Sequence, residues 1–311
     1  MFASGPDLLR LLLVPLFVYV SLLDIRTRRV PSNIWYLPLA IGVVALVWDG
    51  VIHYTWGELT WTRWQLQTAI SLAIVAPLGY VFWKLGTFGK ADAKAVITLA
   101  VAFPTVPVYL IGETVFPLVW AAAGVFSISI LVNAMFVGLC YPLALATRNV
   151  FTRNIRPIMF IGKPIHWAEI DTQYGRFLDA TDSPTHRGLD LDALRIYLEW
   201  MGTTLDELRA NPNQFKFPDS VPETHTPLSD GRVQTDGGTD DPWAARAFVE
   251  ATDGIYGTRA EELRATLECI SEQEYVWISP GIPFLVPLTF GLLIALTYGD
   301  LLTSMLVLLG W

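Results

Sequence analysis

Long apolar stretches separated by short polar segments dominate both ends of this 311-residue chain. A helix that crosses a bilayer needs about 20 mostly apolar residues. Stretches of roughly this kind are expected at Leu8–Leu23, Ile34–Trp48, Trp64–Trp83, Ala93–Ile111, Thr114–Leu145 and Ile282–Thr297. The pattern therefore predicts an all-α integral membrane protein with about six transmembrane helices.

Some of these stretches have ambiguous ends. Pro142 is expected to kink or end the fifth helix, and Asp300 interrupts the apolar residues at the C-terminus. We interpret Leu301–Trp311 as the outer end of the last helix, with two short segments as the alternative. The first stretch is interpreted as a retained anchor, because Asp7 precedes it and a basic segment follows it, unlike a secretory signal.

A polar insert separates the fifth stretch from the last. Residues 148–275 contain 13 Lys and Arg against 22 Asp and Glu, a net charge of −9, whereas the rest of the chain carries +1. This division excludes a soluble single domain, a disordered chain and a basic nucleic-acid binder. We expect a membrane domain at 1–147, an acidic insert at 148–275 and the last membrane helix at 276–311, with the lipid bilayer as partner.

The insert itself has a mostly helical pattern. Apolar residues at helical spacing predict helices at Leu191–Trp200, Trp243–Ala251 and Arg259–Ile270, and Thr203–Leu208 has the pattern of a capped helix start. Residues 212–241 are rich in Pro, Gly, Asp, Ser and Thr and are expected to form a loop. The chain has only five lysines, and an acidic, lysine-poor surface favours a salt-rich cytoplasm, with an ordinary acidic domain as the alternative.

The basic residues predict the orientation of the chain. Lys and Arg of short loops collect on the cytoplasmic side of membrane proteins. One side collects Arg26, Arg28, Arg29, Lys84, Lys90, Lys94, Arg148, Arg153 and Arg156, whereas the other has Arg63 and Arg10. The first group is therefore expected to face the cytoplasm together with the insert. Both termini are then expected outside.

Carboxylates at a membrane span are costly and indicate function. The predicted topology places only Asp24 and Asp92 of the membrane body on the inner side, each at the boundary between a helix and a basic loop. Two carboxylates that lie together can share a proton, so that one accepts a proton from water while the other polarises a carbonyl. The alternative is structural, because a lone Asp near a helix end is often a cap or an arginine partner.

Other catalytic arrangements find little support in the sequence. Cys140 and Cys269 lie far apart and cannot form a thiolate metal site together. The four histidines are scattered and show no metal-binding spacing. We therefore expect no metal and no cofactor.

The segments around the two aspartates resemble those of a known family. Residues 24–33, Asp-Ile-Arg-Thr-Arg-Arg-Val-Pro-Ser-Asn, resemble the first active-site segment of type IV prepilin peptidases. Residues 89–94, Gly-Lys-Ala-Asp-Ala-Lys, resemble their second active-site motif, and residues 279–287 resemble the proline-rich start of their last helix. The resemblance covers residues 8–147 and 276–300 and is nearest to the archaeal preflagellin and prepilin peptidases. It leaves the insert unplaced.

This resemblance implies a function and a set of site residues. It implies a membrane aspartic endopeptidase with Asp24 and Asp92 as the catalytic pair, which removes the leader peptide of preflagellins or type IV prepilins at the cytoplasmic face. Gly89 and Lys94 are expected to support the pair. Gly89 would let the backbone approach a substrate strand or adopt a positive φ, with a plain loop glycine as the alternative. Lys94 would hold Asp92 in register or tune its pKa, with extension to the membrane interface as the alternative. Ala91 replaces the glycine of bacterial members, which favours the archaeal branch. The chain lacks the paired Cys-x-x-Cys of bacterial relatives that also methylate their products.

Three other functions remain open at this stage. A proton- or ion-coupled transporter would use the same acids, although such proteins place them near the midplane of the bilayer. A membrane anchor whose insert recruits a partner would tolerate loss of both aspartates. An intramembrane protease with a different substrate would share the chemistry.

Overall fold

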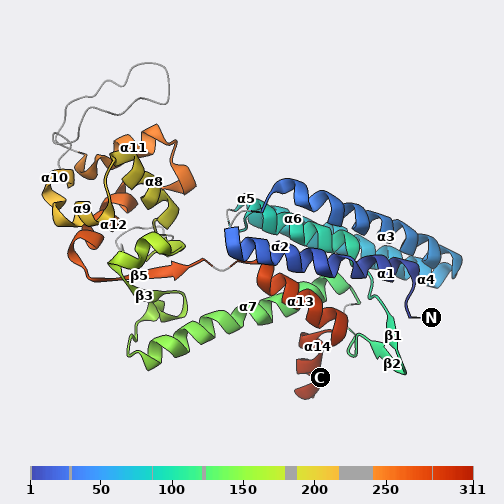
Figure 1. Cartoon of the computed structure of the whole chain (residues 1–311). Helices are drawn as coiled ribbons and strands as arrows, with labels where there is room; N and C mark the ends of the chain where they lie inside the picture. The colour runs from blue at the N-terminus through green and yellow to red at the C-terminus, as the bar shows by residue number, and fades with distance from the viewer. Residues whose placement is uncertain are drawn as a thin grey trace. The chain divides into compact units, whose positions relative to one another are not determined.

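The computed structural model describes residues 2–27, 30–85, 87–120, 124–178, 188–216, 241–281 and 283–310 (Figure 1). Arg28, Arg29 and most of the expected loop, residues 217–240, lie outside this set. The chain divides into two compact units, residues 1–141 with 283–311 and residues 142–282. The first unit contains most of the apolar helices, and the second contains most of the acidic residues.

Apolar helices make up most of the first unit. Among the described residues, four helical stretches are long and apolar enough to cross a membrane: Gly5–Thr27, Ser32–Thr55, Glu58–Lys84 and Phe126–Phe151. A shorter apolar helix, α13, runs from Leu285 to Thr297. These helices confirm the expected all-α membrane class, and the number of spans stays a prediction.

The first three helical stretches extend beyond the apolar residues that predicted them. The first consists of α1 (Gly5–Leu11) and α2 (Leu13–Thr27), and the break between them arises because Pro15 has no N–H for the carbonyl of Leu11. The second is a 3₁₀ turn at Ser32–Trp35 followed by α3 (Tyr36–Thr55). The third comprises α4 (Glu58–Ile70), a π-helical turn at Ser71–Val75 and α5 (Ala76–Lys84).

The expected fourth and fifth spans are wrong at their shared boundary. Helix α6 covers only Lys90–Ala102, and α7 begins at Phe126 and runs to Phe151. Between them lies an antiparallel hairpin of β1 (Tyr109–Ile111) and β2 (Thr114–Phe116). The prolines at 104, 107 and 117 stop helix growth, and the β-branched residues among them favour a strand.

The interpretation of the C-terminus as one helix is also wrong. Helix α13 ends at Thr297, and a separate helix, α14, covers Leu301–Leu308. Gly299 between them has a φ of +110°, which breaks the helix. Asp300 caps α14, since its Oδ1 accepts from the backbone N of Thr303 at 2.7 Å.

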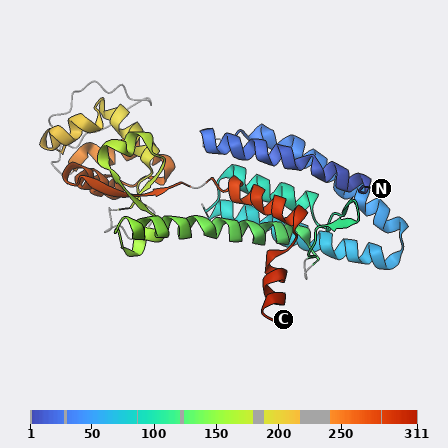
Figure 2. The ribbon, with the colours of Figure 1, turned by 60° about the horizontal axis from the view of Figure 1, so that its bottom comes forward.

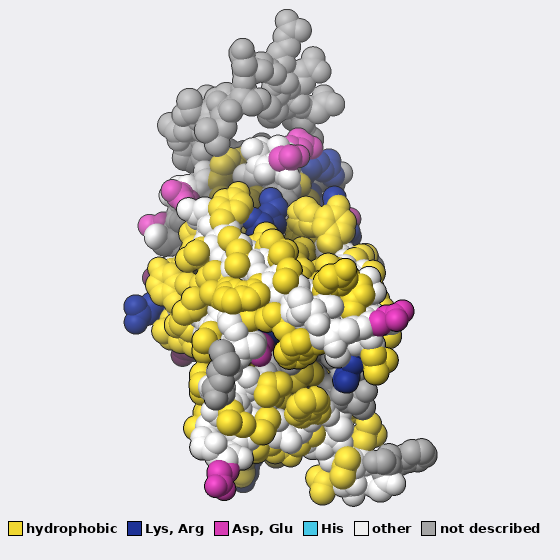
Figure 3. Space-filling model, turned by 90° about the vertical axis from the view of Figure 1, so that its right-hand side faces the viewer, with side chains coloured by type: hydrophobic (Ala, Val, Ile, Leu, Met, Phe, Trp, Pro, Cys, Tyr) yellow, Lys and Arg dark blue, Asp and Glu magenta, His cyan; other side chains and the backbone are white. Residues whose placement is uncertain are grey.

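Close helix packing holds the first unit together. Figures 1 and 2 show its helices side by side, with α13 along α2 and α6 along α3. A Cβ on Gly42 of α3 would lie 3.1 Å from the Cβ of Ala102 of α6, so small residues set this approach. Hydrophobic side chains, with scattered charges, cover much of the face shown in Figure 3, which looks onto one end of these helices.

The second unit combines helices with a small sheet. Its helices are α8 (Leu191–Met201), α9 (Leu205–Ala210), α10 (Pro212–Lys216), α11 (Ala245–Ala251) and α12 (Ala260–Glu272). Its antiparallel sheet has the order β3–β5–β4, with β3 at Lys163–His166, β4 at Gly175–Phe177 and β5 at Tyr275–Pro280. The core gathers around Trp243, Tyr197 and Phe248, which are fully buried.

The helices of the insert lie where the sequence predicts them, but the sheet does not follow from the sequence analysis. Thr204 and Glu207 cap α9 reciprocally, as the capped pattern indicates. The loop expected at residues 212–241 does not begin at 212, because Pro212–Lys216 is helical. Strand β5 falls in a short apolar run before the last helix, and a run of this length does not distinguish a strand from a helix.

Candidate functional site

Asp24 and Asp92 lie close together in the first unit. Asp24 is half-buried near the C-terminal end of α2, and Asp92 is half-buried in the first turn of α6. They are near enough for the charge of Asp24 to act on the carboxyl of Asp92. Two residues 68 positions apart in the chain thus lie within electrostatic range of each other, one near the end of α2 and one in the first turn of α6.

Gly89 positions Asp92 through the backbone. The backbone N–H of Gly89 donates to Oδ2 of Asp92 at 3.0 Å, so the carboxylate closes the N-terminus of α6. The φ of Gly89 is −67°, so the expected positive φ is wrong. A Cβ at this position would lie 3.2 Å from Oδ2 of Asp92, so the glycine leaves room for this carboxylate. The expected approach to a substrate strand stays a prediction.

The surroundings of Asp92 favour its protonated form. Asp92 precedes the apolar stretch that begins at Ala93 and lies outside the long apolar spans. Burial and the charge of Asp24 raise the pKa of Asp92 to about 6, although the N–H of Gly89 opposes them. Asp92 therefore keeps its proton over a pH range in which an exposed aspartate is ionised.

Lys94 contacts a different part of the chain from the one expected. Its Nζ donates to the carbonyl oxygen of Ser32 at 3.3 Å. This contact ties the start of α6 to the 3₁₀ turn that precedes α3. Lys94 thus lies one turn from the pair and holds the helix that carries Asp92.

The start of the last helix lies next to the segment of Asp24. Ser21, one turn before Asp24, donates from Oγ to the carbonyl oxygen of Leu285 at 2.9 Å and lies 2.7 Å from Oγ1 of Thr289. The ring of Phe88 lies 4.5 Å from that of Phe284, centroid to centroid. The three segments that carry the sequence resemblance therefore meet in one region of the fold.

Sequence analysis missed Ser21 and Thr289 as residues that join two of these segments. Both are small polar residues inside apolar helices, and both are buried. A hydroxyl in an apolar helix often forms a hydrogen bond to a neighbouring helix. This tendency is the one sequence signal that could have identified Ser21 and Thr289.

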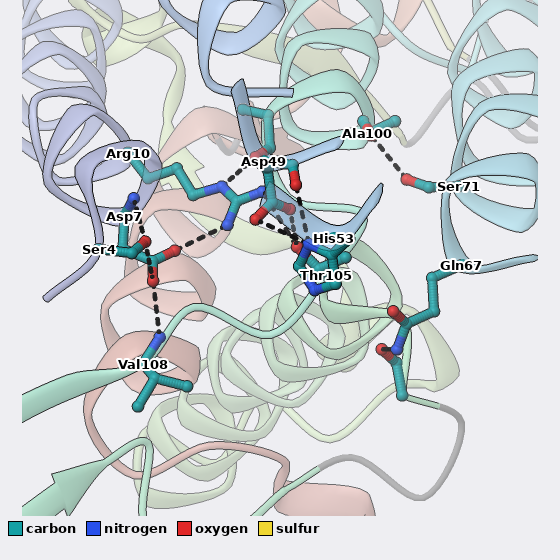
Figure 4. Close-up of polar contacts among 12 residues, drawn as sticks. Ser4, Asp7, Arg10, Asp49, His53, Gln67, Ser71, Ala100, Thr105 and Val108 are labelled. Carbon is teal, nitrogen blue, oxygen red and sulfur yellow. Dashed lines mark hydrogen bonds and ion pairs between the residues drawn. The ribbon is translucent and has the colours of Figure 1, made fainter. Parts of the chain in front are cut away.

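A buried ionic cluster lies at the other end of α6 (Figure 4). Arg10 is 1% exposed and donates from Nη1 to Asp7 at 2.7 Å and from Nη2 to Asp49 at 3.0 Å. Its Nε donates to the carbonyl oxygen of Ala102, the last residue of α6, at 2.8 Å. Thr105 completes the cluster, since it bonds to both Arg10 and Asp49. This arrangement fixes the end of α6 opposite Asp92.

Metal ligands do not gather anywhere in the described part of the chain. No group of three or more His, Cys, Asp or Glu side chains there is arranged to hold a metal ion.

Comparison with known families places this geometry in context. Residues 11–143 match the type IV leader peptidase family, and residues 223–301 match the archaeal peptidase A24 C-terminus, type II. Over these two stretches the chain is similar to the peptidases of this family. The first match contains both Asp24 and Asp92, and the second extends from the insert to the end of the last helix.

A curated relative is similar over about half of the chain. The preflagellin peptidase of Methanocaldococcus jannaschii is 21% identical over 158 residues, which make up 48% of this chain. The chain spans 63% of the length of that relative. The four long apolar helices, together with the similarity to the leader peptidase family, indicate a membrane protein.

Proposed function

We propose that this protein is a membrane aspartic endopeptidase that removes the short basic leader of preflagellins or type IV prepilins. Asp24 and Asp92 are its catalytic residues, and Gly89 and Lys94 support them. The observation that carries the proposal is the approach of Asp24 to within electrostatic range of Asp92. The name of the relative, a preflagellin peptidase, supports the choice of substrate.

The two carboxyls have different roles in hydrolysis, one as general base and the other as general acid. Ionised Asp24 takes a proton from water while the water oxygen attacks the carbonyl carbon of the scissile bond. Protonated Asp92 donates to the carbonyl oxygen, and its raised pKa suits this role. When the intermediate collapses, the C–N bond breaks and the amine takes a proton from the pair, which leaves a carboxylate and a new N-terminus.

The membrane faces follow from the distribution of basic residues. Lys90 and Lys94 flank Asp92, and Arg26 follows Asp24 by two residues. Because lysine and arginine collect on the cytoplasmic side, the pair and the acidic unit lie on that side and the Arg10 cluster lies near the opposite face. The apolar helix of a substrate then lies in the bilayer with its leader at the cytoplasmic boundary.

The decisive experiment is cleavage of an archaeal preflagellin by membranes that contain the full chain. Asp24→Asn and Asp92→Asn keep the size of the side chain but remove its acid–base chemistry. Glu113→Gln is the matched control, because Glu113 is an exposed carboxylate of the β1–β2 turn. Each Asn variant is expected to lose at least about 100-fold in rate, as for loss of a general acid or base, and Glu113→Gln to cleave normally.

The other outcomes distinguish the alternative functions. Equal cleavage by all variants would show that the aspartates are structural and would disprove the proposed mechanism. No cleavage by folded, inserted wild-type protein would favour a transporter or an anchor. Cleavage of an unrelated membrane segment, but of no preflagellin or prepilin, would keep the chemistry and change the substrate.

A further inference from the structure

A basic pocket lies in the second unit, outside the aspartate site. It has a volume of about 640 Å³ and is lined by the C-terminal end of α7, the segment that follows it, and strands β3 and β5. Three of its lining residues are arginines, Arg148, Arg153 and Arg156, and none is a carboxylate. This composition is unusual for residues 148–275, whose net charge is −9.

The arginines of the pocket lie next to the paired strands β3 and β5. Pro164 of β3 pairs with Trp277 of β5 in the antiparallel register. The guanidinium carbon of Arg156 lies 5.7 Å from the centroid of the Trp277 ring. Asn149 donates from Nδ2 to the carbonyl oxygens of Met159 and Gly162, at 2.8 and 2.7 Å, which holds the segment against the end of α7.

Arg148 and Arg153 keep their positive charge without a neighbouring carboxylate in the described part of the chain. Among the described residues, no carboxylate lies within ion-pair distance of Arg148 or Arg153. Burial and the charge of Arg148 lower the pKa of Lys163, although Glu169 opposes them. The electrostatic potential at the pocket is therefore positive and favours the binding of an anion.

The length of α7 places this end of the helix at the membrane surface. Its 26 residues extend for about 39 Å at 1.5 Å per residue. The hydrocarbon core of a bilayer is only about 30 Å thick, whereas the headgroup layers bring the total to roughly 40–45 Å. The last turns of α7, with Arg148, therefore reach the headgroups.

Exposed apolar side chains accompany the arginines. Phe151 is 83% exposed and Ile155 is 68% exposed, and both belong to the segment that lines or adjoins the pocket. Tyr275, an aromatic residue of the pocket rim, is 63% exposed. Apolar, aromatic and cationic side chains on one short segment are typical of contact with the lipid interface rather than with bulk water.

We propose that the pocket of Arg148, Arg153 and Arg156 binds the phosphate of an anionic lipid headgroup from the leaflet in which α7 ends. The guanidinium groups supply paired N–H donors that match phosphate oxygens. Phe151 and Ile155 lie beside the headgroups at the same interface. The bound lipid anchors the acidic unit to the membrane at the end of α7.

The test measures lipid binding to the purified full chain in uncharged detergent by native mass spectrometry. Phosphatidylglycerol, phosphatidylcholine and inorganic phosphate are titrated separately. The variant Arg148→Gln/Arg153→Gln is compared with Arg246→Gln/Arg259→Gln, which removes two exposed arginines of the same unit outside the pocket. Arg148→Lys/Arg153→Lys retains the charge and tests whether the first variant fails for structural reasons.

Phosphatidylglycerol is expected to bind the wild type and the control variant alike. The apparent Kd of Arg148→Gln/Arg153→Gln is expected to rise about 30-fold, since each cation near a membrane surface contributes about 1 kcal/mol. The lysine variant should recover most of this loss.

Three results would overturn the proposal. Equal affinity in the pocket and control variants, or equal binding of phosphatidylcholine, would show that the arginines do not select the headgroup. Displacement of phosphatidylglycerol by millimolar inorganic phosphate, with phosphate bound in its place, would assign the pocket to a free anion. The lipid-binding test does not use the cleavage assay of the aspartate pair. Either proposal can therefore be disproved without affecting the other.

Discussion

Nη2 of Arg10 donates to Oδ2 of Asp49 at 3.0 Å, deep between α1 and α3. The same guanidinium bonds to Asp7, to Thr105 and to the carbonyl oxygen of Ala102. One buried side chain thus connects the first helix, the third helix and the end of α6. Since α6 carries Asp92 at its other end, this cluster fixes the helix on which the proposed chemistry depends.

Removal of the charge of Arg10 is expected to destabilise the protein strongly. Arg10→Met leaves Asp7 and Asp49 buried without a cation, which costs roughly 3–5 kcal/mol in comparable cases. Arg10→Lys keeps the charge but cannot form all four contacts, so an intermediate loss is expected. The measurement is the thermal unfolding midpoint in detergent, with exposed Arg63→Met as the control. A midpoint for Arg10→Met equal to that control would disprove the role of the cluster.

Gly291 is expected to be essential for the packing of α13 on α7. A Cβ at this position would lie 2.6 Å from the backbone N of Ala134 and the carbonyl O of Ile130, so one helix must shift. Gly291→Ala should therefore lower the unfolding midpoint by the equivalent of about 1–3 kcal/mol. Gly138→Ala in α7 is the matched control, because its Cβ would meet only Pro287, at 4.0 Å. Equal midpoints for the two variants would contradict this packing.

Gly89→Ala is expected to impair cleavage more than stability. The φ of Gly89 is accessible to alanine, but the new Cβ crowds Oδ2 of Asp92 at 3.2 Å. A displaced rotamer costs about 0.5–1.5 kcal/mol, which corresponds to a loss of up to about tenfold in kcat. Lys90→Ala, at the next and exposed position, serves as the control. If both variants lose activity equally, the effect comes from the loop and not from the carboxylate.

The pH dependence of cleavage is expected to follow the aspartate pair. Burial and Asp24 raise the pKa of Asp92 to about 6, so the proposed proton donor is lost as the pH rises above that value. The profile of kcat/KM for the free enzyme should show an alkaline limb near this pKa, which belongs to the pair as a whole. A profile that is flat from pH 5 to pH 8 would exclude Asp92 as the proton donor.

Asp241 gives the acidic unit a different pH dependence. Burial alone would raise the pKa of Asp241, but the backbone N–H groups of Arg246 and Ala247 and the guanidinium of Arg264 outweigh it and lower the pKa. A carboxyl with a lowered pKa stabilises the fold above its unfolded pKa of about 3.9, and this contribution is lost as the pH falls through the folded value. The difference in unfolding midpoint between wild type and Asp241→Asn should therefore shrink below about pH 4. A constant difference would contradict the assignment.

The sequence predicts the class of fold and the helices of the insert well. Long apolar runs with few charges are expected to form helices in a bilayer because backbone groups there must be satisfied within the segment. The same argument fails between residues 103 and 125. The apolar composition there predicts continuous spans, whereas the structure has a hairpin among the prolines. Strand β5 was missed because its partners β3 and β4 lie about 100 residues earlier in the chain.

Asp24, Asp92 and Gly89 were identified as candidates from local motifs, and their roles stay proposals. Helix ends, charge and spacing are local properties, so the sequence by itself determined the apolar helices, the acidic unit and the candidate acids. Tertiary structure decided which of these residues meet. Ser21 with Thr289, Arg10 with Asp49, and the arginines with Trp277 depend on packing between segments far apart in the chain, and no local pattern encodes such distances.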